Sequence, residues 1–244
     1  RSIGSDMEMM LAAAGVLAIV PAFLVLYFSL KKYTYPAVEE PFFSDPKMFG
    51  LMVVGMIEGT VIFVAYTWFL GMWSSLLVAL LIGILTEVVK LVTLNLKRFH
   101  GQSDTVFYGF SLGVGTAIAM AGGMTFYLGS IASSGGGIDA ATWFIILVYV
   151  MQQVLLHPAT GATIGEGIAR LRIAEFLIQA VMVSAVYQIL MTPVWAAEGV
   201  WIYLSAIVAL ACVIFYFLRV VRRYMPRVVQ DVLKMQGDKR RVPR

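Results

Sequence analysis

The sequence is short of charge, cysteine and histidine, and each shortage excludes a class of protein. Charged residues make up 13% of the 244 residues, about half of the ~25% typical of a soluble domain. Cys212 is the only cysteine, so a disulfide within the chain cannot form. The two histidines, His100 and His157, lie far apart in the sequence, and no HExxH motif is present. A soluble enzyme, a disulfide-stapled domain and a typical zinc hydrolase are therefore all disfavoured.

Long apolar runs are what the sequence has in abundance. Hydrophobic residues account for 60% of the chain, the mean hydropathy is +0.86, and the runs recur at about 20 residues, enough for a helix to cross ~30 Å of hydrocarbon. The runs are continuous and do not alternate residue by residue, which excludes a β-barrel. We predict an all-α polytopic membrane bundle with seven spans: Met10–Leu30, Met48–Leu70, Trp73–Leu96, Thr105–Ile131, Ala140–Gly167, Ile173–Met191 and Val200–Leu218. Pro158 predicts a kink or a break in the fifth span.

Basic residues alternate between the connections and predict the orientation of the bundle. The first, third and fifth connections and the C-terminal segment carry lysine or arginine, whereas the connections containing GMW, ASSGGG and TPVWAAEG carry none. By the positive-inside rule, the N-terminus lies outside and the C-terminus in the cytoplasm. We divide the chain into a transmembrane domain, 7–218, and a basic cytoplasmic tail, 219–244, which includes a short amphipathic helix near Val228–Met235. Residues 1–6 (RSIGSD) are expected to be an expression remnant before a native start at Met7, and the first apolar run does not resemble a signal peptide.

Ionisable residues inside the predicted spans are the candidates for function, because charge in hydrocarbon is costly and marks functional sites by default. Glu87 and Lys90 lie three residues apart in the third span, and Glu87 is about 15 Å from its cytoplasmic end. His157 is about 20 Å deep in the fifth span, and Glu58 lies near the middle of the second. These groups can converge inside a bundle. Structural roles are the alternative: a Glu87–Lys90 pair that neutralises itself, or a histidine that satisfies backbone carbonyls beside Pro158.

Small residues indicate close packing between the fourth and fifth spans. Gly109 and Gly113 form one GxxxG pattern, and Gly161 and Gly165 form another. Glycines at this spacing allow two membrane helices to approach closely. We expect a polar side chain near the fourth span to be pressed against it with little room for water.

Four segments, in chain order, resemble the PrsW family of intramembrane proteases. These are VPAFLVLYFSLKKYTYPAVEEPFFSDPKMFGLMVVG, LTEVVKLVTLNLKR, SDTVFYGFSLGVGTAIA and LLHPATGATIGEGIAR. The second resembles the family's EExxK helix and the fourth its histidine helix. The resemblance implies a helical membrane protease of a prokaryotic cell membrane that depends on glutamates.

Carried across residue by residue, the resemblance assigns catalytic roles to Glu87, Lys90 and His157. Asp104 matches the family's aspartate before the fourth span. The chain departs from the family at several positions: Thr86 replaces the first glutamate of EExxK, Met120 and Ala121 replace a glutamate–asparagine pair, and Gly161 replaces a hydroxyl that Thr160 and Thr163 flank. The supporting candidates are Glu58, Asp104, Thr86 and Thr160, with Glu58 a substitute for a missing glutamate.

We expect Glu87 to activate water for peptide hydrolysis, since burial in hydrocarbon makes a carboxylate a stronger base. His157 would share the proton or stabilise the oxyanion, and Lys90 would hold Glu87. This requires Glu87 and His157 to face one wet cavity, separated by about one bridging water. A zinc bound by Glu87 and His157 is a weaker alternative, so we expect no metal and no cofactor.

Two other functions remain open at this point. A pseudoprotease would bind or scaffold membrane proteins without cutting them, and would have a dry Glu87–Lys90 pair. A proton-coupled or ion transporter would use Glu58, Glu87 and His157 as a relay, but the sequence has no internal repeat to suggest one. The expected partners are the lipid bilayer and a transmembrane protein substrate. Nucleic acid is not expected, because the basic tail lacks base-stacking aromatics, and no feature of the sequence specifies an oligomeric state.

Overall fold

The structure of the chain is a computed structural model that describes residues 3–68, 75–134, 138–196 and 199–242. Within these ranges the secondary structure is helical, and seven helices are long and apolar enough to cross a membrane. This confirms the predicted all-α fold and the number of spans. The predicted boundaries at Leu70 and Trp73 lie outside the described residues. The long helices are α1 (Ile3–Leu30), α2 (Asp45–Trp68), α3 (Leu76–Leu94), α4 (Thr105–Ser134), α5 (Ala140–Ala169), α6 (Ile173–Ala196) and α7 (Val200–Arg219).

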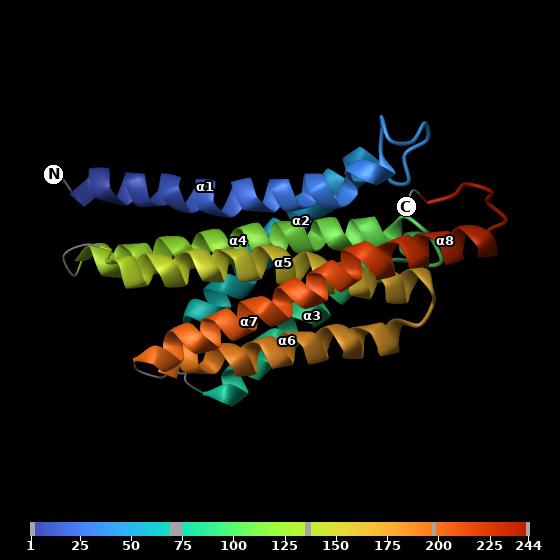
Figure 1. Cartoon of the computed structure of the whole chain (residues 1–244). Coiled ribbons are helices and arrows are strands. Elements are labelled where there is room, and N and C mark those ends of the chain that lie inside the picture. The colour runs from blue at the N-terminus through green and yellow to red at the C-terminus, as the bar shows by residue number, and fades with distance from the viewer. Residues whose placement is uncertain (1–2, 69–74, 135–137, 197–198, 243–244) are drawn as a thin grey trace.

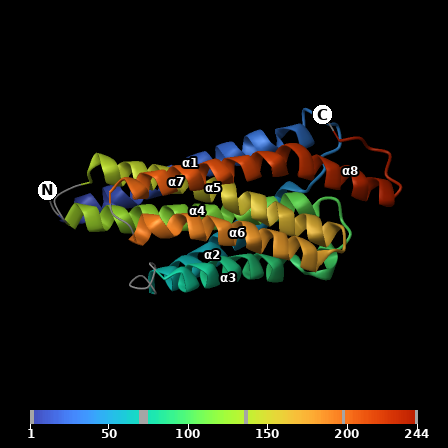
Figure 2. The ribbon, with the colours of Figure 1, turned by 60° about the horizontal axis from the view of Figure 1, so that its bottom comes forward.

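Helices α4 and α5 run side by side through the middle of the bundle (Figures 1 and 2). Helices α1 and α2 pack on α4, whereas α3, α6 and α7 gather around α5. Most of the α4 span, 83%, is buried, compared with 22% of the α6 span. Helix α4 is therefore the core of the bundle, and α6 is a peripheral helix held mainly by one face.

The peripheral helices carry apolar side chains on their outer faces. Leu81 and Leu85 on α3 and Ile178 and Met182 on α6 are exposed in the isolated chain. Such a distribution, with apolar groups outside and polar groups inside, is unfavourable in water and favourable in lipid. It is therefore consistent with a bundle surrounded by a bilayer.

Close packing of α4 depends on glycines that face two different neighbours. A Cβ on Gly113 would overlap the carbonyl oxygen of His157 and lie 2.7 Å from the Cα of Pro158, both on α5. A Cβ on Gly115 would overlap the carbonyl oxygen of Met52 on α2. Backbone atoms block both positions, so only glycine allows these helices to approach so closely.

Helix α5 continues through Pro158, so the break expected there is absent, whereas the alternative expectation, a kink, stays a prediction. Proline removes one backbone donor, and packing against neighbouring helices tolerates this in a membrane. The helix begins with a cap in which Asp139 accepts a hydrogen bond from the backbone N–H of Thr142 at 2.8 Å. Hydrogen bonds from the side chain and the backbone of Thr142 lower the pKa of Asp139, which lies outside the spans.

The C-terminal segment packs against the bundle. Helix α7 continues through a π-helical segment, η4 (Val220–Tyr224), into the amphipathic helix α8 (Met225–Met235). Five apolar side chains of α8 are buried, namely Met225, Val228, Val229, Val232 and Leu233, and the helix contacts α4 and α5. Arg170, at the end of α5, donates to Asp231 of α8 at 2.9 Å, and the side-chain amide of Gln236 donates to the carbonyl of Gly101 at 2.9 Å. Burial of this apolar face explains why α8 stays on the protein rather than lying in the lipid surface.

Replacing Gly115 tests the α2–α4 packing. We expect Gly115→Ala to lower stability by about 1–3 kcal/mol, because the added methyl group meets a backbone carbonyl that cannot rotate away. The matched control is Gly50→Ala on α2, where no atom lies within 4 Å of the new Cβ. Thermal unfolding of the two variants in the same detergent gives the comparison. Equal melting temperatures would contradict the packing described here.

Candidate functional site

Helix α3 buries a stripe of residues at helical spacing, and the middle of this stripe is polar. Its buried members are Ala79, Ile82, Gly83, Thr86, Glu87, Lys90 and Leu94. Positions three and four apart share a helix face, so packing α3 against α5 and α6 brings Glu87 and Lys90 inside the bundle. Both side chains are fully buried.

The ammonium group of Lys90 joins α3 to α5. Its Nζ donates to Glu87 Oε1 and Oε2 at 3.0 and 3.1 Å and to Thr160 Oγ1 at 2.8 Å. It also lies 3.1 Å from Nδ1 of His157. An ammonium group has three protons and no lone pair, so these contacts use its full donor capacity.

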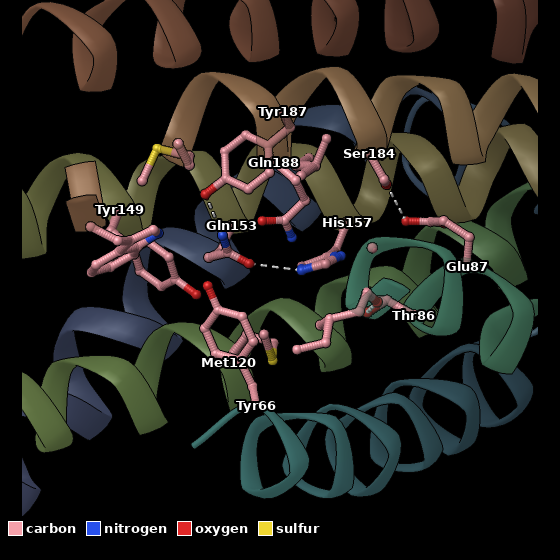
Figure 3. A pocket seen from close by; sticks show the side chains of 15 residues that line it. Tyr66, Thr86, Glu87, Met120, Tyr149, Gln153, His157, Ser184, Tyr187 and Gln188 are labelled. Carbon is pink, nitrogen blue, oxygen red and sulfur yellow. Dashed lines mark hydrogen bonds between the residues drawn. The ribbon is translucent and has the colours of Figure 1, made fainter. Parts of the chain in front are cut away.

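Helix α6 completes the environment of Glu87. Ser184 Oγ donates to Glu87 Oε1 at 2.7 Å, as the dashed line in Figure 3 shows. The carboxylate therefore receives hydrogen bonds from its own helix and from α6. Hydrogen bonds from charged donors are roughly twice as strong as those between neutral groups, so the ammonium group of Lys90 is the strongest partner of this carboxylate.

The contacts of His157 define its tautomer. Because Lys90 can only donate, Nδ1 accepts, and the ring proton resides on Nε2. There it donates to Gln153 Oε1 at 2.7 Å, one helical turn earlier. The geometry therefore corresponds to a neutral imidazole with both nitrogens satisfied.

The hydrogen-bonded chain continues in one direction from Gln153. Its amide donates to the hydroxyl of Tyr187 at 2.8 Å, and Tyr187 donates to Gln152 Oε1 at 3.2 Å. The amide of Gln152 then donates to the backbone carbonyl of Ala206 at 2.9 Å. The chain thus links α3, α5, α6 and α7 and ends inside the bundle, at a buried residue of α7.

A small cavity lies between these groups (Figure 3). Its volume is about 20 Å³, and a site needs ~10–15 Å³ to hold one water. Glu87, His157, Thr86 and Ser184 are among the residues that line it. Three tyrosines and two glutamines lie around the same space: Tyr66, Tyr149, Tyr187, Gln153 and Gln188. Apolar side chains, among them Met120 and Leu156, complete the lining. The cavity therefore has polar groups on one part of its wall and room for about one water, but no room for a peptide.

The predicted site residues divide into two groups. Glu87, Lys90, His157 and Thr160 contact one another, and Thr86 lines the cavity while its hydroxyl donates to the carbonyl of Ile82 at 2.8 Å. The structure thus brings together five residues that were selected from depth and resemblance.

Glu58 and Asp104 are not among the residues that line the cavity. Glu58 accepts a hydrogen bond from Thr93, and its second oxygen, Oε2, is buried without a hydrogen-bond partner. It is an electrostatic neighbour of Lys90, on the side of α3 that faces α2. Asp104 lies just before α4 and interacts with Tyr108. The arrangement gives no support to Glu58 as a substitute for a missing glutamate beside the water.

Three residues of the site were missed by sequence reasoning: Ser184, Tyr187 and Gln153. The sequence did contain a signal for Gln153. It belongs to a glutamine pair inside an apolar run and lies four residues before His157, and residues at this spacing share a helix face. Ser184 and Tyr187 had no comparable signal, since single serines and tyrosines are common in membrane helices.

The donor set does not suit a metal held by Glu87 and His157. The ammonium group of Lys90 already lies within 3.1 Å of both side chains, so it takes the position of the cation. Among the described residues, no group of three histidine, cysteine, aspartate or glutamate side chains is arranged to bind a metal. Zinc sites usually need at least three such ligands.

Comparison with known proteins returns no relative. No protein-family model matches the chain, no curated protein matches it, and no solved structure matches it. The chemistry of the cluster must therefore be argued from its own geometry.

The buried ion pair can be tested by a double-mutant cycle. We expect Lys90→Met to cost about 3–5 kcal/mol, because it leaves Glu87 buried without its cation. The double variant Glu87→Leu, Lys90→Met should be more stable than Lys90→Met, since it removes both charges. Unfolding of the wild type, the two single variants Glu87→Leu and Lys90→Met, and the double variant in one detergent measures the coupling.

The exposed pair formed by Arg172 and Glu175 provides the control for this cycle. Its side chains are 61% and 56% exposed, so Glu175→Ala should change stability by at most about 1 kcal/mol. A Lys90→Met variant as stable as Glu175→Ala would contradict the role given to Lys90.

Proposed function

We propose that the chain is a PrsW-like intramembrane peptidase, which hydrolyses transmembrane segments at a site that is closed in this structure. The observation that carries the proposal is the shared cavity. Glu87 and His157 come from different helices and line one buried space with room for about one water. A water between a carboxylate and an imidazole is the arrangement that general acid–base hydrolysis needs.

The energetic cost of the cluster supports a use beyond packing. A buried ion pair is weak evidence for stability, because desolvation of two charges offsets much of their attraction. Apolar residues of similar size would fill the same space without that cost. A buried pair surrounded by a histidine and hydroxyl groups is better explained by chemistry than by packing.

Each group has a role in the proposed reaction. The water oxygen attacks the carbonyl carbon of the substrate while Glu87 accepts a water proton. Glu87 then returns this proton to the amide nitrogen as the C–N bond breaks, leaving a carboxylic acid and an amine. The ammonium group of Lys90 holds the carboxylate of Glu87. The Nε2–H group of His157 gives up its hydrogen bond to Gln153 and donates to the oxyanion instead.

Substrate access requires α6 to move. Two residues of α6 bond to groups around the cavity. Ser184 donates to Glu87, and Tyr187 accepts from Gln153. Helix α6 is also the least buried of the spans, at 22%. Displacement of α6 would break these two contacts and open the cavity sideways to the lipid, from which a transmembrane segment would enter.

A non-catalytic function is the second candidate, and the internal pairing of the cluster favours it. Glu87 and Lys90 are fully buried and fully hydrogen-bonded within the protein. In this alternative, the chain is a pseudoprotease that binds membrane segments without cutting them. A transporter is less well supported, because the polar chain ends at Ala206 inside the bundle.

The location follows from the same proposal. We propose that the bundle lies in a prokaryotic cell membrane with its basic end, which contains Arg170 and α8, in the cytoplasm, as the positive-inside rule requires. The substrate would be a transmembrane protein that reaches α6 through the lipid.

Cleavage of single-span substrates in liposomes tests the proposed activity. We expect the wild type to cut at least one of a panel of such substrates and Glu87→Gln to be slower by about 100-fold or more, because it removes the general base. The control is Glu175→Gln, which changes an exposed carboxylate on α6. Cleavage by Glu87→Gln at the wild-type rate would exclude Glu87 as the base. Crosslinking to the substrates without cleavage by either protein would favour the pseudoprotease.

Locking α6 to α3 tests the movement. A Cβ built on Gly83 lies 3.8 Å from the Cβ of Ser184, which is a suitable separation for a disulfide. In a Cys212→Ser background, we expect the pair Gly83→Cys, Ser184→Cys to be inactive when oxidised and to regain activity on reduction. The reduced form of the same protein is the matched control. Equal activity in both forms would show that α6 does not need to separate from α3.

A further inference from the structure

Two hollows follow one another along α6. The first lies between α6, the end of α5 and the segment formed by η4 and α8, and the second lies between α6 and α7. The first has a volume of about 270 Å³ and lies at the basic end of the bundle. Its lining includes Arg170, Arg172, Phe176, Gln179, Tyr224 and Arg227. The second has a volume of about 230 Å³ and is almost entirely apolar, with Met182, Val186, Ala209, Cys212 and Val213 among its lining residues.

The spacing of these residues makes the hollows parts of one groove. On α6 the lining runs from Phe176 and Gln179 to Met182 and Val186, always three or four residues apart, so it follows one helix face. At 1.5 Å per residue, Phe176 to Val186 is about 15 Å. Helices α6 and α7 are in contact, and in Figure 1 they diverge toward α8. The groove therefore has a polar mouth at the end of the bundle and an apolar floor along the spans.

Arginines in the mouth retain donors for an anion. Arg170 is paired with Glu166 and Asp231, and Arg172 is paired with Glu175. Arg227 is 76% exposed, and its nearest carboxylate oxygen is 3.8 Å away. A guanidinium has five N–H donors, so these pairs do not exhaust the three side chains. Glu166, Asp231 and Glu175 balance the formal charge of the three arginines, so the mouth offers unused guanidinium donors, chiefly those of Arg227, rather than an excess of charge.

We propose that this groove along α6 binds a phospholipid with an anionic headgroup. Its phosphate would lie in the mouth, where arginines form strong paired hydrogen bonds with phosphate oxygens. One acyl chain would follow the apolar floor. Basic pockets between membrane helices at the cytoplasmic side are suited to such headgroups. The unused guanidinium donors and the order of polar and apolar hollows both favour a lipid over a free ion or a second helix.

The groove also touches the central cluster. Tyr187 lines both the apolar floor and the central cavity, and its hydroxyl accepts from Gln153. An acyl chain in the groove would contact the same α6 residue that helps to close the cavity. This link rests on the proposed function, whereas lipid binding itself does not.

Cys212 allows the groove to be tested directly, because it is the only cysteine and lies on the groove floor. We would measure the rate at which a maleimide labels the full-length protein in detergent, with added phosphatidylglycerol, phosphatidylcholine or inorganic phosphate. We expect phosphatidylglycerol to slow labelling at least fivefold, with little effect of the other two additives. Equal protection by phosphatidylcholine would show that the arginines do not select the headgroup, and would overturn the proposal.

Two variants separate the lipid from other occupants. The double variant Arg172→Gln, Arg227→Gln should need at least ten times more phosphatidylglycerol for the same protection. The control variant Arg98→Gln changes an exposed arginine of the α3–α4 connection and should need no more than the wild type. Unchanged protection in the first variant would overturn the proposal. Protection by inorganic phosphate alone would indicate an ion site in place of a lipid site. Protection that depends on protein concentration, with a larger particle mass in solution, would indicate a second copy of the chain in the groove. Neither measurement uses peptidase activity, so the result is independent of the proposed function.

Discussion

The arrangement of α3, α5 and α6 depends on one buried ammonium group. Lys90 satisfies Glu87, Thr160 and His157 at once, and Glu87 in turn receives Ser184 from α6. In hydrocarbon none of these groups has water as an alternative partner, so each contact restricts where its helix can lie. The cluster is therefore both a constraint on helix packing and a source of chemically reactive groups.

The glycine-rich contact between α4 and α5 makes this cluster possible. It brings the backbone of α5 against α4 at Gly113, opposite His157 and Pro158, and so fixes the depth and rotation of α5. A deeply buried α4–α5 pair on one side and a peripheral α6 on the other give the cavity one wall in the core of the bundle and one wall at its edge. This difference in burial is what makes a closed and an open state physically reasonable for the same set of contacts.

The sequence predicted the spans and the central residues for related physical reasons. Seven apolar runs have few alternatives as membrane helices, and a charge inside such a run must find a partner, which singled out Glu87, Lys90 and His157. Ser184 and Tyr187 could not be selected in this way, because uncharged hydroxyl groups cost too little in a membrane to stand out. The packing of α8 was also beyond the sequence, since an amphipathic helix has the same pattern whether its apolar face meets lipid or protein.

The glutamine pair of α5 has a consequence for how the chain enters the membrane. Gln152 reaches its acceptor, the carbonyl of Ala206, 54 residues further along the chain, and Gln153 relies on a tyrosine of α6. When α5 is synthesised, neither partner exists yet, and lipid offers no substitute. Helix α5 must therefore remain in contact with water, the insertion machinery or α4 until α6 and α7 follow. Truncation after α5 would leave this helix as the least stable part of the nascent protein, although its proline and glycines are already packed against α4.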